Sequence, residues 1–257
     1  MASRYYLIHG MDPFRKGFME SEFSKNGLRQ DEVTWIYYPN KNDDFPPNIC
    51  INPILKKGQI ACTYKHYLAL KDIVENKHEI AVIMEDNIQF KGHIPDAINR
   101  YLKEVPSGWD IIWDSNFVVD HDFCSDSLFF DGEKRSIYSE KMTTVHPNGF
   151  HTFNYDTQTY FDFKATNKIL YKKDESRGAN FYIVNKRSAK LLYDNFLPFS
   201  NCSDHHYNDL IKRHNLNSYW VEPPNVDKLQ RYSTWKDNSL AKYIWNRNLN
   251  SKWIIKT

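Results

Sequence analysis

The chain has 257 residues, with 34 basic and 32 acidic side chains and a formal net charge of +2. A hydrophobic share of 41% is enough to build a core, which excludes a disordered chain, and the near-neutral charge excludes binding to nucleic acid through a global positive field. The sequence shows neither a signal peptide nor an apolar run of about 18 residues, so we expect a cytoplasmic protein without a transmembrane segment.

The first part of the chain alternates predicted strands and helices. Residues 4–9 are an apolar run and predict a strand, and a helix follows that Asp12 can cap and Gly27 can end. A second strand is predicted at 33–39. The clearest helix is predicted within 56–79, because its apolar residues recur at helical spacing.

The segment EIAVIMEDNIQF, residues 79–90, is an apolar strand that ends in three polar residues, Glu85, Asp86 and Asn87. A helix followed by a continuous apolar strand predicts a buried, largely parallel sheet. Two adjacent carboxylates repel each other unless water or a cation lies beside them. The acids therefore either cap the strand and solvate a turn, or hold a metal ion.

The rest of the chain continues the alternation and then becomes irregular. Strands are predicted at 109–113 and 180–185, and a late strand within 218–226 ends in a loop at the double proline. Helices are predicted at 101–105, 186–197 and 239–253. Hairpins and long loops are predicted between Val118 and Asp174, where polar and aromatic residues alternate. The pattern is that of one α/β domain with a loop-rich second half.

Three segments in a fixed order carry a family resemblance: residues 57–73, with Cys62 and His66, residues 81–90 and residues 177–211. Together they resemble the family 25 glycosyltransferases, which include lipooligosaccharide and collagen hydroxylysine galactosyltransferases. That family shows a Gly-Glu-Ile-Gly-Cys-x-x-Ser-His helix and an apolar strand ending in Glu-Asp-Asp. A Gly-Thr-x-x-Tyr-x-Ile strand follows, with a basic helix and a Pro-x-Asp. The resemblance spans about Arg4 to Ser233.

The resemblance implies a GT-A type fold, which is α/β with a central mixed, mostly parallel sheet flanked by helices. It implies a single domain over 1–257, with a nucleotide-binding half at 1–117 and an acceptor-binding half at 118–257. The implied activity is that of an inverting hexosyltransferase, which moves galactose or glucose from a UDP-sugar to a hydroxyl group of a glycan or a protein. Neither nucleic acid nor a membrane is an expected partner.

If the chain is a glycosyltransferase, the acidic residues at the end of the strand have a chemical role. A departing nucleotide diphosphate needs its charge neutralised, usually by a divalent cation, and hard cations such as Mn²⁺ and Mg²⁺ prefer oxygen ligands. Open α/β sheets bind ligands where their strands end. Asp86 is the expected main metal ligand, helped by Glu85 and Asn87. Asn87 stands where the family has a second aspartate, and its amide brings no charge, so we expect weaker metal binding.

Further site residues follow from the resemblance. The nucleotide is expected to contact Asp12, Arg15, Lys57, His66, Glu85 and Gln230. Asp204 matches the aspartate of the family's Pro-x-Asp and is the expected general base for the acceptor hydroxyl. His66 is equally compatible with a structural role, and Cys62 is expected to be a packing residue.

Two other functions stay open. The first is a catalytically inactive GT-A-like protein that only binds a nucleotide or glycan, a reading that Asn87 supports. The second is a nucleotidyl or phosphoryl transferase, which is disfavoured because the sequence has neither a GxGxxG nor a GxxxxGK[ST] phosphate loop. The sugar, the acceptor and the oligomeric state are not determined by the sequence.

Overall fold

The computed structural model describes residues 3–115, 170–172, 176, 178–221 and 224–229. These residues belong to one compact unit, built from 1–117 and 169–236, and a second unit, of 118–168 and 237–257, lies outside them. A seven-stranded sheet of order β2-β1-β3-β7-β5-β8-β6 forms the centre of the first unit. Its strands are β1 (Arg4–Ile8), β2 (Val33–Ile36), β3 (Ile80–Glu85), β5 (Ile111–Trp113), β6 (Leu170–Lys172), β7 (Phe181–Asn185) and β8 (Ser218–Val221).

Helices and a small second sheet complete the described part. The second sheet pairs β4 (Ile88–Phe90) with β9 (Val226–Lys228). The helices are α1 (Pro13–Lys25), the 3₁₀ turn η1 (Gln30–Glu32), α2 (Lys57–Glu75), α3 (Ile94–Glu104), α5 (Lys186–Phe196) and α6 (Ser203–His214). Among the described helices, none combines the length and apolar character needed to cross a membrane.

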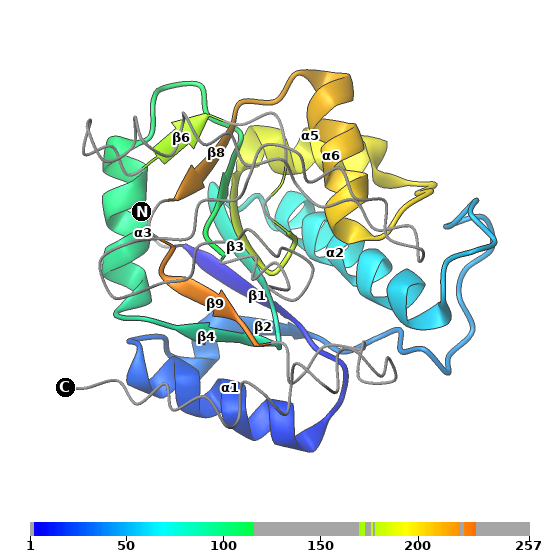
Figure 1. Ribbon diagram of the computed structural model, residues 1–257, viewed down its shortest axis with the longest axis horizontal. Coiled ribbons are helices and arrows are strands. Elements are labelled where there is room, and N and C mark those ends of the chain that lie inside the picture. The colour runs from blue at the N-terminus through cyan, green and yellow to red at the C-terminus, as the bar shows by residue number, and fades with distance from the viewer. Residues whose placement is uncertain (1–2, 116–169, 173–175, 177, 222–223, 230–257) are drawn as a thin grey trace, which may run out of the picture. The chain divides into compact units, whose positions relative to one another are not determined.

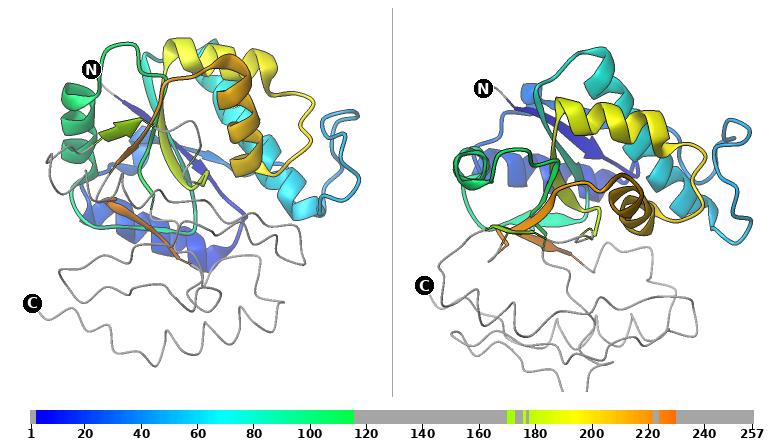
Figure 2. Two further views of the ribbon diagram at one scale, coloured as in Figure 1. Left: turned by 45° about the horizontal axis from the view of Figure 1, so that its top comes forward. Right: turned by 90° about the horizontal axis from the view of Figure 1, so that it is seen from above.

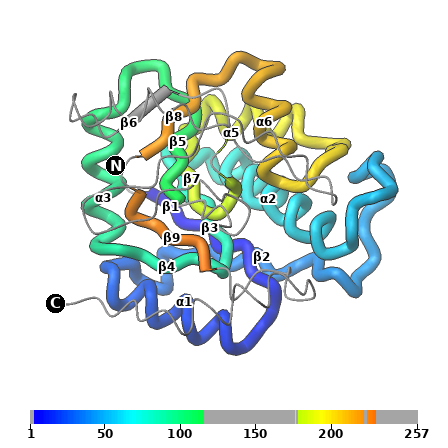
Figure 3. Tube along the Cα trace, in the orientation of Figure 1, coloured from blue at the N-terminus to red at the C-terminus, as the bar shows by residue number. Residues whose placement is uncertain are grey.

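The sheet is mixed and mostly parallel, as the sequence predicts. β1 pairs in parallel with β2 and β3, and β5 pairs in parallel with β8. β7 runs antiparallel between β3 and β5, about a hundred residues from β3 along the chain but next to it in space (Figure 3). Because β6 is also antiparallel to its neighbour, five of the seven strands, β2, β1, β3, β5 and β8, point the same way.

Helices cover both faces of the sheet (Figures 1 and 2). The main apolar cluster joins one face, with Leu7 and Val82, to Phe23 of α1 and Ile98 of α3. On the other face α2, α5 and α6 pack, and Tyr6 donates a hydrogen bond to Asp72 of α2 at 2.6 Å. Alternate residues of β1 and β3 thus face different helices, which decides where the polar strand end points.

Most predicted elements are found, with local differences. Asp12 caps α1, Pro13 is its first residue, and Gly27 follows its end with φ of +80°. The predicted late strand from Ser218 to the double proline is β8, which ends at Val221, and residues 226–228 form β9 of the other sheet, which was not predicted. Helix α6 has no counterpart among the sequence predictions. The predicted helix at 239–253 and most of the predicted hairpin region lie outside the described residues.

Candidate active site

The three polar residues that end β3 point to two sides of the sheet. Strand alternation sends Glu85 toward α2, where it meets Cys62 and His66, and sends Asp86 toward the loop that follows β1. Asn87 returns to the side of Glu85, since both accept a hydrogen bond from Asn180. The adjacent carboxylates therefore do not share one environment.

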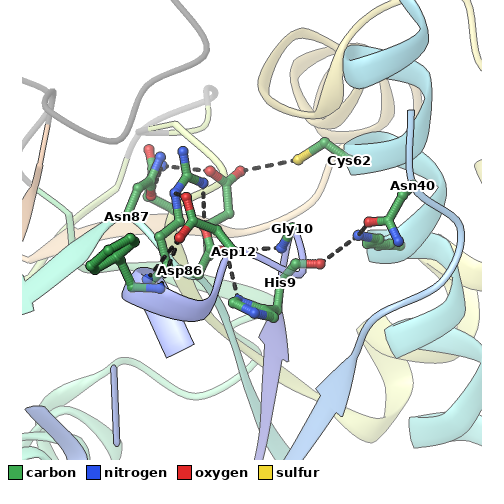
Figure 4. A network of polar contacts seen from close by, with 12 residues as sticks. His9, Gly10, Asp12, Asn40, Cys62, Asp86 and Asn87 are labelled. Carbon is green, nitrogen blue, oxygen red and sulfur yellow. Dashed lines mark hydrogen bonds and ion pairs between the residues drawn. The ribbon is translucent and has the colours of Figure 1, made fainter. Parts of the chain in front are cut away.

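Asp86 is enclosed by hydrogen-bond donors and positive charge (Figure 4). Its Oδ1 accepts from the Arg15 guanidinium at 2.8 Å, and its Oδ2 lies 2.8 Å from His9 Nδ1 and 2.9 Å from the amide nitrogen of Gly10. Burial alone would raise the pKa of Asp86, but the hydrogen bond from His9 and the charge of Arg15 outweigh it and hold the pKa below its usual value. Asp86 is thus ionised, with partners on both oxygens.

The register of the sheet brings these partners together. Ile8 of β1 lies opposite Glu85 of β3, so the residues that follow the two parallel strands, His9 and Asp86, meet at one edge. Arg15 lies in the first turn of α1, where Asp12 accepts from its backbone nitrogen at 3.3 Å. The cap of α1 therefore helps to orient the guanidinium toward Asp86.

A buried lysine supports the same loop from behind. Lys65 of α2 donates to the backbone oxygen of His9 at 2.5 Å and to Asn40 Oδ1 at 3.1 Å. Its side chain is almost fully enclosed, and this burial lowers the pKa of Lys65. With Arg15, it places two basic side chains next to the end of β3.

Glu85 and Asn87 converge on one nitrogen atom. Asn180 Nδ2 lies 2.8 Å from Glu85 Oε2 and 3.1 Å from Asn87 Oδ1. Asn180 immediately precedes β7, and its backbone oxygen accepts from the Glu85 nitrogen, which fixes the pair in register. Two oxygen atoms on different side chains thus point at a single position at the end of the strand.

The other oxygen of Glu85 connects to a buried chain of hydrogen bonds. Glu85 Oε1 lies 3.4 Å from His66 Nε2, His66 Nδ1 lies 2.9 Å from the Tyr182 hydroxyl, and that hydroxyl lies 2.5 Å from the Tyr207 hydroxyl. Burial raises the pKa of both tyrosines, so both keep their protons. A proton on Nε2 toward the carboxylate makes Nδ1 the acceptor, so Tyr182 donates to His66 and Tyr207 donates to Tyr182.

The charge around Glu85 keeps it ionised. Burial would raise its pKa, but the hydrogen bond from His66 and the charge of Lys228 lower it below the usual value. Asp204, the second residue of α6, is half-buried, and the charge of His205, a hydrogen bond from Cys202 and the charge of Lys228 lower its pKa. Lys228 of β9 therefore acts on both Glu85 and Asp204, which places the two carboxylates in one electrostatic neighbourhood.

The structure gathers most of the predicted site residues in two groups. Asp12, Arg15 and Asp86 form one group, and His66, Glu85 and Asn87 form the other.

One predicted contact, Lys57, lies apart from both groups. Lys57 is exposed, nine residues before His66, which is about two and a half helical turns and thus the opposite side of α2. Gln230 lies outside the described residues.

Several residues of the site were not predicted. His9 and Gly10 follow a strand parallel to β3, so the rule that parallel strands end at one edge could have identified them. Asn180 could not be found in this way, because it precedes a strand that enters the sheet antiparallel. Cys62, expected to be a packing residue, lies 3.7 Å from Glu85 Oε1.

The donor set fits a hard divalent cation. Glu85 Oε2 and Asn87 Oδ1 are oxygen ligands of the kind that Mn²⁺ and Mg²⁺ prefer, and they already point at one atom. A half-turn of the Asn180 amide would exchange its nitrogen for a third oxygen. Asp86 is the less suitable ligand, because both of its oxygens hold Arg15, His9 and Gly10.

One comparison with known proteins identifies the family of the chain. A family model described as "Glycosyltransferase family 25 (LPS biosynthesis protein)" matches residues 11–209. No curated protein sequence matches the chain.

Solved structures resemble it at low identity. A197 from STIV is 8% identical, with 88% of this chain and 83% of that chain covered and a TM-score of 0.47. A mutant of Drosophila beta-1,4-galactosyltransferase 7, in complex with manganese, UDP-Gal and xylobiose, is also 8% identical, with coverages of 86% and 66% and a TM-score of 0.37.

Proposed function

Because the chain belongs to glycosyltransferase family 25, we propose that it moves a hexose, galactose or glucose, from a UDP-sugar to a hydroxyl group of a glycan or a protein, with inversion. The chain is a glycosyltransferase, and the proposal concerns its donor, its metal and its acceptor. The observation that carries the proposal is the convergence of Glu85 and Asn87 oxygens on one position at the end of β3.

Glu85 and Asn87 are the residues proposed to hold Mn²⁺ or Mg²⁺, in the space between their two oxygens and the oxygen that a rotated Asn180 amide presents. The cation supplies positive charge to the diphosphate that leaves. The sequence singled out Asp86 as the main metal ligand, and that prediction is untested. Its contacts favour a different role, in which Asp86 anchors the Arg15 guanidinium and the loop after β1 beside the donor.

Asp204 is the proposed general base. An inverting transfer needs a carboxylate that accepts the proton of the acceptor hydroxyl as that oxygen attacks the sugar. The lowered pKa of Asp204 means that it is ionised at neutral pH and able to accept a proton. Its shared electrostatic partner with Glu85, Lys228, supports a place for Asp204 on the acceptor side of the same site.

The basic side chains near the acidic strand end support an anionic donor. Arg15 retains 18% of its side-chain exposure while it pairs with Asp86, so part of its surface is open to a ligand. Lys65 adds a second positive charge behind His9. Together they offset the charge of the two carboxylates, which would otherwise repel the arriving diphosphate.

Release of free UDP tests the proposal. The full chain is incubated with UDP-galactose or UDP-glucose and a mixture of glycan and peptide acceptors, with Mn²⁺ or with EDTA. We expect UDP to appear with one donor, and to fall to background in EDTA. If the chain bound the UDP-sugar but released no UDP in Mn²⁺ with any acceptor, it would be the catalytically inactive binding protein, the alternative that the uncharged Asn87 supports.

A further inference from the structure

Cys62, His66 and Glu85 form a second cluster of metal-binding side chains, separate from the two oxygens that face Asn180. One ligand atom from each, the thiol sulfur, an imidazole nitrogen and a carboxylate oxygen, lies within 4.8 Å of the other two. Cys62 and His66 are four residues apart on α2, so they project from the same face of one helix. Glu85 reaches them from the end of β3.

The donor types differ from those of a site for Mn²⁺ or Mg²⁺. A thiolate, an imidazole and a carboxylate suit a borderline cation such as Zn²⁺, whereas hard cations prefer oxygen alone. We propose that Cys62, His66 and Glu85 bind Zn²⁺, with solvent as the fourth ligand. The Oε1 atom of Glu85 belongs to this site, and its Oε2 atom belongs to the site beside Asn87.

The spacing of the donor atoms fits tetrahedral coordination. Zinc bonds of about 2.0 to 2.3 Å place neighbouring ligand atoms about 3.3 to 3.6 Å apart. Glu85 Oε1 lies 3.4 Å from His66 Nε2 and 3.7 Å from Cys62 Sγ. Small side-chain shifts therefore suffice to build the site, and the partly exposed Glu85 leaves a side from which the ion and its water can enter.

His66 already has the outer partner that zinc-binding histidines usually have. Its Nδ1 lies 2.9 Å from the Tyr182 hydroxyl, which orients the ring. On binding, the Cys62 thiol loses its proton to solvent, and the His66 proton moves from Nε2 to Nδ1. Nδ1 then donates to Tyr182, and Tyr182 donates to Tyr207, so the hydroxyl chain reverses without losing a hydrogen bond.

A second group, Cys202, Asp204 and His205, is the competing candidate in the described part of the chain. Cys202 is the N-cap of α6, Asp204 and His205 lie in its first turn, and the Cys202 thiol donates to Asp204 at 3.1 Å. His205 is only half-buried, whereas His66 is fully buried and its ring is oriented by the Tyr182 hydroxyl. The buried, oriented histidine therefore favours the Cys62 group.

Zinc at this site would affect transfer, and this consequence rests on the proposed function. Two divalent cations on the two oxygens of Glu85 repel each other, so zinc lowers the affinity of the neighbouring position for Mn²⁺. Zinc at low concentration is then an inhibitor of UDP release.

Cobalt binding to the reduced full chain tests the site without any sugar donor. With Co²⁺ alone, we expect a thiolate-to-cobalt charge-transfer band and the visible bands of tetrahedral cobalt at one equivalent, both abolished by Zn²⁺. The charge-transfer band should be lost in Cys62→Ser and retained in Cys50→Ser, Cys124→Ser and Cys202→Ser. Absence of the band in the wild type, its survival in Cys62→Ser, or its loss in Cys202→Ser would each overturn the proposal.

A measurement on the wild type guards against a misfolded variant. X-ray absorption of the zinc-loaded chain should resolve one sulfur ligand at about 2.3 Å together with nitrogen and oxygen ligands. A zinc shell of oxygen atoms alone would contradict the site. Since neither experiment uses turnover, a negative result here leaves the proposed transferase function untouched, and a failure of UDP release leaves the zinc site untouched.

Discussion

The Asp86 carboxylate pairs with the Arg15 guanidinium across 71 residues of chain, with 2.8 Å between Oδ1 and the nitrogen. This ion pair joins the end of β3 to the first turn of α1. It explains how two consecutive acids are tolerated at the end of a buried strand, because one is neutralised by Arg15 while the other faces α2. Asp86 therefore stabilises the fold through this ion pair even without a bound ligand.

Asp86→Asn should therefore lower stability. Arg15 and His9 would lose the carboxylate that compensates their burial, and breaking a buried pair on one side costs about 3 kcal/mol. Urea unfolding of the variant and of Asp96→Asn, a matched change at an exposed acid, measures the difference. A loss no larger than that of the control would show that the pair contributes nothing.

The stability difference should also depend on pH in one direction. The folded pKa of Asp86 is lower than its unfolded value of 3.8, so its contribution is fully present above that value and is lost as the pH falls through the folded pKa. The gap between wild type and Asp86→Asn should be constant near neutral pH and should close below about pH 4. A gap that already closes near neutral pH would contradict this assignment to Asp86.

Asn180→Asp should separate metal binding from stability. A carboxylate beside Glu85 and Asn87 removes the bridging amide nitrogen and adds a second acid next to Glu85, so we expect a lower melting temperature without metal. With Mn²⁺ the three oxygens should bind the ion more tightly, and the melting temperature should recover. Asn195→Asp, at an amide of α5 that donates to a backbone oxygen, is the matched control and should show no gain from Mn²⁺.

The two buried tyrosines should differ in importance. Tyr182→Phe leaves His66 Nδ1 without its donor, at a cost of about 1 to 3 kcal/mol, and frees the imidazole that orients Glu85. Tyr207→Phe keeps the hydrogen bond from Tyr182 to His66 and should cost less. Denaturant unfolding of both variants measures the two losses in stability. Equal losses, or a larger loss in Tyr207→Phe, would contradict the assigned direction of donation from Tyr207 through Tyr182 to His66.

Asp204→Asn should reduce turnover more than donor binding. Removing a general base lowers the rate by about a hundredfold to ten-thousandfold, while the affinity for UDP should change little. The control is Asp209→Asn, further along α6, where the carboxylate accepts a hydrogen bond from the Asn201 side chain. If the affinity for UDP fell together with the rate, Asp204 would contact the sugar donor and not the acceptor hydroxyl.

The sequence predicts much of this fold, for reasons that specific elements show. The helical spacing in residues 57–75 and the cap at Asp12 depend on local preferences, and both elements are present. Helix α6 was missed because its buried Tyr207, Leu210 and Ile211 are spread among polar residues that resemble a loop.

The site was harder to predict than the fold. The roles of Glu85 and Asp86 could not be told apart from their adjacency, because they depend on which helix lies on each face of β3. The part played by Asn180 depends on the insertion of β7 beside β3, which no local pattern near residue 180 indicates.

Binding of Mn²⁺ to Glu85→Gln, measured by electron paramagnetic resonance with UDP present, tests the central claim most directly. Glu79→Gln, at an exposed acid that pairs with Lys186, is the control. We predict that the wild type and the control bind one Mn²⁺ ion. Glu85→Gln should bind it at least tenfold more weakly, and hexose transfer from the UDP-sugar should disappear. Equal Mn²⁺ affinity in all three proteins would contradict a cation held at the end of β3.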